Sequence, residues 1–455
     1  MPIALIALAV FIAIIVIWNV VAKRNMGEAM ILGFLGTLLF AGFNAPSVAV
    51  EAVVEASTSE VLYAAAGFVF MTHFIEKTGA ISRLVQILSS SIGKVRGGPA
   101  LVDAATSGAM GALVGGSNTG NAAASGSITG PWMVKSGWSP ARAATVIAGN
   151  AGLGAALPPS ASMIIMIGFA GSLVTTSQVY LALLVAGIYQ VIWRLILTFW
   201  FVYKDGIKNE SGDDQIPFAQ ALKNGWPTLF IVLGALIPIA VTVGPLANAL
   251  VATGKYGESL DSISLIKWIP ILAILITAIV CWKELPKTAR GWWEFMESSI
   301  PQFFTIGVLL FFAIAASEVL DILGLSRDVE GIIESVNIPL WLLVTLVGLL
   351  VVLVAGPLSS TATLSAVGQV SLFALIGAGV NPLLAVTAML VFASTEGSSP
   401  PASGSIFVAC GITGAKPEST FIPLLVYYVL PIFILGVLIA IGIAPVPTSE
   451  MSAAL

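Results

Sequence analysis

Residues 115–165 read GGSNTGNAAASGSITGPWMVKSGWSPARAATVIAGNAGLGAALPPSASMII, and this stretch decides the fold because it recurs 242 positions later. The second copy, residues 357–407, reads PLSSTATLSAVGQVSLFALIGAGVNPLLAVTAMLVFASTEGSSPPASGSIF. Twelve of the 51 aligned positions are identical, where so restricted a composition gives roughly five by chance. The repeated part is polar and broken by glycine and proline. Paired interruptions of this kind in an apolar chain are typical of a transporter's binding site.

The amino-acid composition of the whole chain indicates that most of its surface faces lipid. The chain has 455 residues, of which 58% are hydrophobic and 9% are charged, and its mean hydropathy is +1.01. Soluble domains carry about 25% charged residues. The sequence therefore predicts an all-α polytopic membrane protein that lies in the lipid bilayer. The net charge of −4 gives no basic surface for nucleic acid.

Apolar runs that cross the ~30 Å hydrocarbon layer need about 20 residues each. This length predicts two broken helices at 141–172 and 383–414, each interrupted by a Pro-Pro pair. The stretches 97–136 and 339–378 are about twice too long for one crossing, so we expect re-entrant hairpins there. Full spans are predicted at 2–22, 27–44, 59–78, 178–203, 226–243, 265–282, 301–320 and 420–443.

The charges predict how the two copies are oriented. Fifteen of the 19 lysines and arginines fall on one side of this arrangement, and the positive-inside rule assigns that side to the cytoplasm. Each half then holds five crossings and one hairpin. Because five is odd, the second half is predicted to be inverted relative to the first. The halves are residues 1–215 and 216–455.

The hairpin tips carry candidate ion-binding residues. Irregular backbone at membrane depth survives only when it is buried in protein or lines a wet cavity. Hydroxyl, amide and freed carbonyl oxygens at such places are the ligands that transporters use for Na+. An acid inside a span is a functional hypothesis by default, so Glu396 joins this set. The candidate ion ligands are Ser117, Asn118, Thr119, Ser359, Ser360, Thr361 and Glu396.

The Pro-Pro breaks carry candidate substrate-binding residues. Each break starts a half-helix whose N-terminal amides favour an anionic group. Small residues at one such place more often only allow close helix packing, but two matched sets in register favour a transport site. The candidate substrate residues are Pro158, Pro159, Ser160, Ser398, Ser399 and Pro400.

Three other features bear on the chemistry. Asp103, near the start of a hairpin arm, is expected to be a solvated acid. Arg194 is expected to extend from its span to the cytoplasmic surface. With one histidine and two distant cysteines, the chain offers no metal cluster and no His-Glu-x-x-His motif. We therefore expect neither an enzyme nor a bound cofactor.

The repeated stretches resemble the first and second hairpins and broken helices of the large membrane subunit of tripartite ATP-independent periplasmic (TRAP) transporters. The Gly-Ser and Pro-Pro signatures are shared across the wider ion transporter superfamily. The resemblance implies an elevator-type transport domain held by a scaffold. It also implies Na+ as coupling ion, organic-acid substrates, a small four-span membrane subunit and a periplasmic binding protein. Glu396 lies where this family usually has small and apolar residues.

The sequence therefore predicts secondary active uptake of a small organic anion, a carboxylate, by a permease subunit of the bacterial inner membrane. The moving unit would be the two hairpins and the two broken helices, held by the remaining spans. One alternative is a stand-alone gluconate-like or dicarboxylate symporter of the same superfamily. A rival of another class is a passive anion channel.

Overall fold

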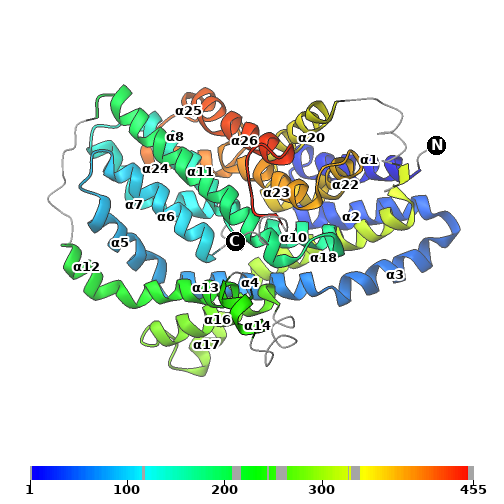
Figure 1. Cartoon of the computed structure of the whole chain (residues 1–455), viewed down its shortest axis with the longest axis horizontal. Coiled ribbons are helices and arrows are strands. Elements are labelled where there is room, and N and C mark those ends of the chain that lie inside the picture. Colours follow the sequence, from blue (N-terminus) through cyan, green and yellow to red (C-terminus); the bar gives the residue numbers. More distant parts are fainter. Residues whose placement is uncertain are drawn as a thin grey trace.

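The computed structural model describes residues 3–114, 118–207, 217–242, 245–252, 264–325, 327–328 and 339–448. Throughout these residues the chain forms helices joined by short turns, and no strand occurs among them (Figure 1). The structure thus confirms the all-α prediction.

The first repeated stretch forms a helical hairpin followed by a broken helix. Ser139 has extended backbone, and its side chain accepts a hydrogen bond from the amide of Arg142. Pro140 then fills the first helical position, where its missing N–H has no helical partner to lose. The elements are α6 (Gly98–Val114), α7 (Asn118–Lys135), α8 (Pro140–Ala151), α9 (Leu153–Ala156) and α10 (Ala161–Ala170).

The second repeated stretch has the same local design. Asn381 accepts from the amide of Leu383 at 2.9 Å, and Pro382 follows it. Gly137 and Gly379, which precede the two caps, share a left-handed φ of +91°. The elements are α20 (Leu340–Ala355), α21 (Ser360–Thr363), the π-helical turn η5 (Leu364–Gly368), α22 (Gln369–Gly377), α23 (Pro382–Ala393), the 3-10 turn η6 (Ser394–Ser398) and α24 (Gly404–Thr413).

The remaining helices lie at the positions of the other predicted spans and of their connectors. Within the first half they are α1 (Ile3–Val16), η1 (Ile17–Val21), α2 (Met26–Leu38), η2 (Leu39–Asn44), α3 (Ala45–Thr58), α4 (Glu60–Lys77), α5 (Ala80–Ile92), η3 (Gly171–Leu173) and α11 (Thr176–Lys204). Within the second half they are α12 (Phe218–Gly225), η4 (Trp226–Val232), α13 (Leu233–Thr242), α14 (Pro245–Ala252), α16 (Leu265–Val280), α17 (Ala289–Glu297), α18 (Ile300–Ile322), α25 (Glu418–Leu424), η7 (Leu425–Val429) and α26 (Leu430–Ala440).

Length and composition give several of the helices, in the repeated stretches and outside them, the character of membrane spans. Among the described residues, five helical stretches are long and apolar enough to cross a membrane: 27–58, 176–204, 218–242, 360–377 and 418–440. The bent pair 140–156 and 161–173, which meets at 41°, makes a sixth. The break in this pair lies at Pro158-Pro159, as the sequence predicts.

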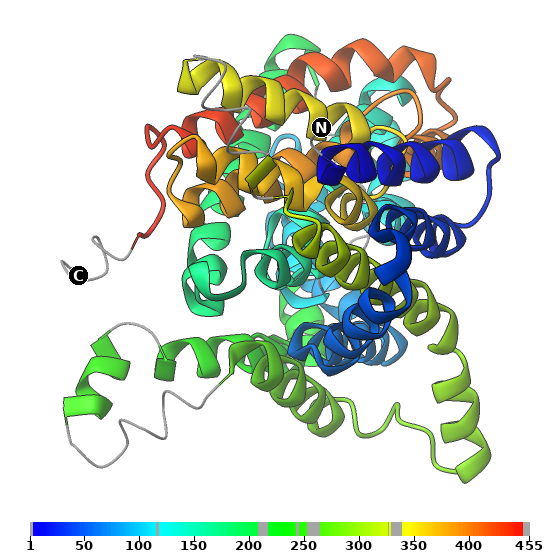
Figure 2. The same ribbon diagram turned by 90° about the vertical axis from the view of Figure 1, so that its right-hand side faces the viewer.

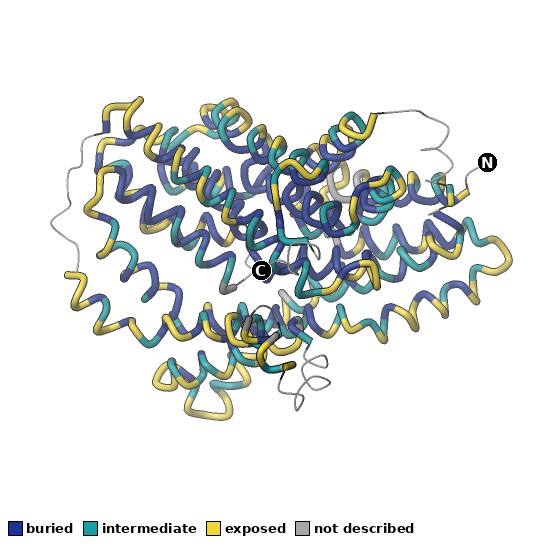
Figure 3. The backbone as a smooth tube through the Cα atoms, viewed as in Figure 1, coloured by how far each residue is buried: buried dark blue, intermediate teal, exposed yellow. Residues whose placement is uncertain are grey.

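The helices form two groups. The core group, residues 98–204 and 340–440, interleaves both repeats: α7 and α8 pack on α24, and α10 and α11 pack on α23. The frame, residues 3–92 and 218–322, is joined by contacts of α2, α3 and α4 with α18, of α4 and α13 with α16, and of α5 with α12. Figure 2 shows part of the frame as a separate lower layer. Buried residues concentrate along the core group (Figure 3).

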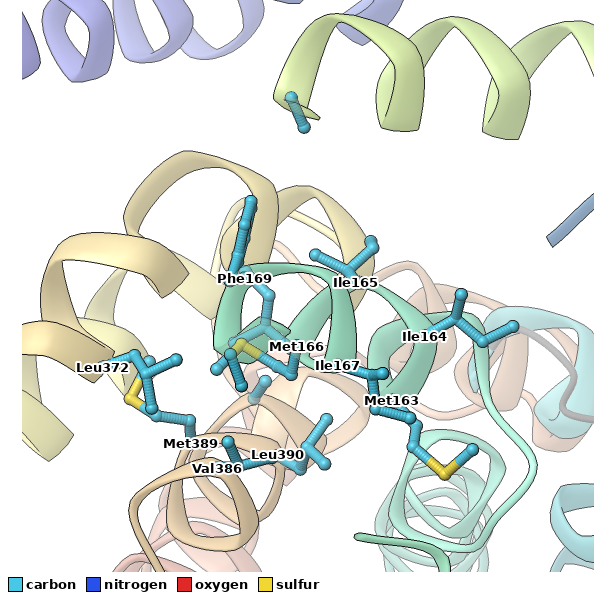
Figure 4. Close-up of a cluster of buried hydrophobic side chains, with 14 of the residues drawn as sticks. Met163, Ile164, Ile165, Met166, Ile167, Phe169, Leu372, Val386, Met389 and Leu390 are labelled. Atoms are coloured by element: carbon cyan, nitrogen blue, oxygen red, sulfur yellow. The ribbon is translucent and has the colours of Figure 1, made fainter. Parts of the chain in front are cut away.

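Helix α10 shows how the core group excludes solvent. Its sequence is apolar all round, which is typical of a helix with neighbours on every side. Met163 and Met166 are fully buried, and Phe169 is 8% exposed. In Figure 4 the side chains of α10 lie among those of α22 and α23, including Leu372 and Met389. The half-helix after the first break is therefore largely buried in protein, and only Gly168 is exposed.

Candidate transport site

The two helix breaks touch each other through their backbones. A Cβ atom on Gly397 would lie 2.8 Å from the backbone nitrogen of Gly152 and 3.0 Å from its Cα. A Cβ on Gly152 would in turn lie 2.9 Å from the carbonyl oxygen of Ser394. Real Cβ atoms do not approach backbone this closely, so only glycine permits the contact. The end of α8 and the turn η6 therefore meet inside the core group.

The tip of the first hairpin joins this contact. The side-chain amide nitrogen of Asn118 donates a hydrogen bond to Oε2 of Glu396. Asn118 is 2% exposed and Glu396 is 7% exposed. The other polar atom of Asn118, Oδ1, is buried without a hydrogen-bond partner. The structure thus brings two of the predicted ion ligands, 278 residues apart, into direct contact.

The residues on either side of Asn118 are also predicted ion ligands. Ser117 lies outside the described residues. Thr119 faces the start of α24, where its Oγ1 lies 2.7 Å from the position of a Cβ on Gly404. The first hairpin therefore reaches both η6 and the half-helix that follows it.

The second hairpin tip lies against elements of both halves. Helix α21 contacts α10 and η6, and a Cβ on Gly356 would lie 3.9 Å from the carbonyl oxygen of Pro400. The hydroxyl of Ser359 accepts from the amide of Ala362 at 3.2 Å and lies 3.1 Å from the hydroxyl of Thr361. Ser360 is 7% exposed. These hydroxyls hold the hairpin's own turn.

The candidate substrate residues line the two breaks. Both the Pro158-Pro159 and Pro400-Pro401 bonds are cis. Pro158 and Pro159 are buried and Pro400 is partly exposed. Ser398 and Ser399 are 0% and 3% exposed, and the Ser398 hydroxyl lies 3.5 Å from the carbonyl oxygen of Gly149.

The two half-helices differ at their N-termini. Ser160 caps α10, because its hydroxyl accepts from the amide of Met163 at 3.1 Å. Ser403 occupies the same position before α24 but makes no side-chain cap. Its hydroxyl instead donates to the carbonyl oxygen of Gly397 at 3.3 Å. The first amides of α24 are thus without the side-chain acceptor that α10 has.

The structure overturns the expectation for Arg194. Its side chain does not reach the surface: it is 0% exposed, and its Nε donates to the carbonyl oxygen of Gly149 at 3.0 Å. Nη1 donates to the backbone and side-chain oxygens of Gln190, and Nη2 is buried without a partner. Gln190 also accepts from Ser394 at 3.3 Å. Arg194 and Gln190 thus link both breaks, because α11 passes behind them.

The expectation of a solvated Asp103 is also wrong. This carboxylate is 0% exposed and accepts hydrogen bonds from side chains of α7 and α8. The reason is that α6 is covered by α7, α8, α9 and α11 along its length. A signal for this burial is present in the sequence, since Asn118, Asn121, Ser125 and Thr129 follow helical spacing and predict one polar face of α7 turned toward protein.

Comparisons with known proteins agree with this architecture. The family model described as "Tripartite ATP-independent periplasmic transporter, DctM component" matches residues 4–445. The C4-dicarboxylate TRAP transporter large permease protein DctM of Pseudomonas aeruginosa is 22% identical over 389 residues, which cover 85% of this chain and 86% of that protein.

Two solved transporters have a similar fold. The YdaH transporter of Alcanivorax borkumensis matches with a TM-score of 0.59 at 15% identity, over 87% of this chain and 86% of that one. MtrF of Neisseria gonorrhoeae matches with a TM-score of 0.61 at 14% identity, over 89% and 85%. The family match covers nearly the whole sequence, so the chain belongs to the DctM family of tripartite ATP-independent periplasmic transporters, whose members are the large membrane component.

Proposed function

We propose that this protein is a secondary active transporter that takes up a small organic carboxylate together with Na+. It acts as the large permease subunit of a tripartite system in the bacterial inner membrane. Its partners are a small four-span membrane subunit and a periplasmic substrate-binding protein. Family membership supports the transport class, and the site geometry supports the coupling.

The observation that carries the proposal is the contact between Asn118 and Glu396. It joins the tip of one hairpin to the break of the opposite broken helix, in a place where both side chains are nearly inaccessible. A hairpin that opens must break this contact. An ion that bridges the two groups would therefore bias the hairpin toward the closed state, which is how ion binding couples to a conformational change.

The donor atoms suit Na+. Glu396 supplies a carboxylate, and Asn118 supplies an amide oxygen that is buried without a partner. Buried polar atoms are normally paired. A cation bound between an unpaired acceptor and a carboxylate would therefore lower the free energy of the folded protein. Hard cations prefer such oxygen ligands. Ser117, Thr119 and the second tip residues Ser359, Ser360 and Thr361 are proposed to complete the ion sites.

The carboxylate is proposed to bind between the tips and the breaks. The N-terminus of α24 carries the positive end of a helix dipole and lacks a side-chain cap, a combination that favours an anion. Pro158, Pro159, Ser160, Ser398, Ser399 and Pro400 form the walls in this proposal. A dicarboxylate is the first substrate to test, because the Pseudomonas aeruginosa relative is named for C4-dicarboxylates.

The test is uptake of radiolabelled succinate into liposomes that hold the purified protein with its small subunit, with binding protein added outside. We expect an inward Na+ gradient to accelerate uptake, an H+ gradient alone to leave it near background, and omission of the binding protein to abolish it. Ser117→Ala and Thr361→Ala should each weaken the Na+ dependence.

Other results would favour the other functions. Full uptake without the binding protein favours a stand-alone symporter. Uptake that follows the substrate gradient and ignores both ion gradients favours a passive channel. Coupled uptake that survives both substitutions unchanged would show that the proposed ion ligands are wrong.

A further inference from the structure

A second polar cluster lies away from the hairpin tip, between α6, α7 and α8. At its centre is the carboxylate of Asp103. Its Oδ1 accepts from the hydroxyls of Ser125 at 2.6 Å and Thr129 at 2.7 Å, and its Oδ2 accepts from the Asn150 amide at 2.8 Å. All four residues are 0% exposed. Three helices thus converge on one buried acid.

No positively charged side chain pairs with this cluster in the described part of the chain: the buried Arg194 binds the carbonyl oxygen of Gly149, next to Asn150, and forms no ion pair with Asp103. The hydrogen-bond partners of Asp103 are all neutral, and none of the ion pairs found in the described part of the chain includes it. A buried carboxylate without a counter-charge costs several kcal/mol even when it is hydrogen-bonded. A small cation at this place would remove much of that cost.

The cluster also holds spare acceptors. Oδ1 of Asn150 is buried and has no hydrogen-bond partner, and the same is true of Oδ1 of Asn121 one turn nearer the hairpin tip. Because the oxygen and nitrogen of an amide exchange places by a flip, Asn150 can present its oxygen toward Asp103. The hydroxyls of Ser125 and Thr129 can likewise rotate to offer lone pairs.

We propose that Asp103, Ser125, Thr129 and Asn150 form a monovalent-cation site that binds Na+. One carboxylate and three neutral oxygens supply a single negative charge, whereas Ca2+ takes about 6–8 oxygen ligands and usually several carboxylates. Ser125 follows Asn118 by seven residues on α7, which places this site about 10 Å along the helix from the tip. The two sites are therefore separate, and the choice of Na+ over another monovalent ion rests on the proposed function.

The site gives the first hairpin a second place at which a bound ion would hold it against its neighbours. Asp103 lies on one arm of the hairpin, Ser125 and Thr129 lie on the other, and Asn150 lies on the broken helix beside them. A bound ion would hold both arms against α8 while the tip site closes on Glu396. Ion binding at the Asp103 cluster and ion binding at the hairpin tip would then each stabilise the closed position of the same hairpin.

The test is equilibrium binding of radioactive 22Na+ to the purified full-length protein, without substrate. Asp103→Asn keeps the shape of the side chain and removes its charge, and we expect it to bind one Na+ fewer per protein than wild type. Ser125→Ala should weaken the same site roughly 10-fold, because it removes one ligand. The control is Ser127→Ala, whose exposed hydroxyl bonds only the backbone oxygen of Ala124, and it should bind like wild type.

Two results overturn the inference. One is an Asp103→Asn protein that elutes as a folded, monodisperse species and binds as much Na+ as wild type with the same affinity. The other is a wild-type protein that binds no Na+. The uptake assay separates this inference from the proposed function: H+-driven uptake, with Na+ binding that still depends on Asp103, rejects the proposed coupling and keeps the cluster site.

Discussion

Glycine determines how closely the two helix breaks approach. Gly397 packs its Cα against the backbone of Gly152, and Gly111 on α6 packs against the carbonyl oxygen of Leu153, which a Cβ at that position would overlap. These three glycines lie on α6, at the end of α8 and in η6, and Gly397 directly follows Glu396 in the turn that meets Asn118. A methyl group at any of them would push against backbone atoms, which cannot turn aside as a flexible side chain can.

Gly397→Ala tests at a single residue whether the close approach of the two helix breaks requires glycine. The added Cβ meets the backbone of Gly152, so we expect a loss of stability of about 1–3 kcal/mol, which is typical of overpacking, and a severe loss of uptake. Thermal unfolding of the purified protein and succinate uptake measure the two effects.

The matched control lies on α24. A Cβ added to Gly411 would meet no atom within 4 Å, and alanine is the better helix former by about 0.5–1 kcal/mol. Gly411→Ala should therefore leave uptake intact and raise the unfolding temperature slightly. Equal effects of the two substitutions on uptake and on the unfolding temperature would show that neither depends on the close approach at Gly397.

The residue scale also shows where sequence reasoning succeeds and fails. Glu396 stands out because an acid in a membrane span is rare, and its role could be proposed from that alone. The burial of Arg194 has no comparable signal, because the group that binds it is distant in sequence: Gly149 is 45 positions from Arg194. The polar face of α7 predicts contact with protein but does not identify Asp103 as its partner, because Asp103 lies on another helix and its third partner, Asn150, is 47 positions away. The position of a charge along a span does not reveal which helices lie around it.

At the scale of elements, the hairpins and broken helices follow from local signals. The caps at Ser139 and Asn381, the prolines that follow them and the Pro-Pro pairs all act within a few residues. Other elements leave weaker signals. The sequence pattern does not predict helix α3 or the π-helical turn η5, and the packing of α10 against both α4 and α23 depends on contacts that no short stretch encodes.

The contact between α4 and α10 yields a prediction about movement. A Cβ on Gly168 of α10 would lie 3.7 Å from the Cβ of Val61 on α4, close to the mean of about 3.8 Å for disulfides. Val61→Cys combined with Gly168→Cys should therefore form a disulfide between the frame and the core group. If the core group moves as an elevator, oxidation should abolish uptake and reduction should restore it.

A disulfide within the frame supplies the control. A Cβ on Gly67 of α4 would lie 3.6 Å from the Cβ of Pro270 on α16, so Gly67→Cys with Pro270→Cys links two frame helices. This link should leave uptake unaffected. The native thiols of Cys281 and Cys410 are free and buried and stay in place. Full uptake by a completely cross-linked Val61–Gly168 pair would contradict movement of α10 past α4.

At the scale of the whole molecule, the two repeats are interleaved. Helix α7 of the first half packs on α24 of the second, and α10 of the first packs on α23 of the second. The matched caps and the left-handed glycines before them agree with a repeat, and its inverted orientation stays a prediction. The interleaving explains why the site contains residues from both halves: the first hairpin meets η6 and α24 of the second half, and the second hairpin meets α10 of the first half and η6 of its own.

The most direct test of the central claim is the Na+ dependence of succinate uptake in four proteins: wild type, Asn118→Ala, Glu396→Gln and the double variant. If Asn118 and Glu396 hold one ion together, each single substitution should raise the half-saturating Na+ concentration about 10-fold, equivalent to about 1.4 kcal/mol. The double variant should be little worse than either single variant, because both remove the same site. Half-saturating concentrations that stay at the wild-type value, or that rise multiplicatively in the double variant, would contradict a shared ion site.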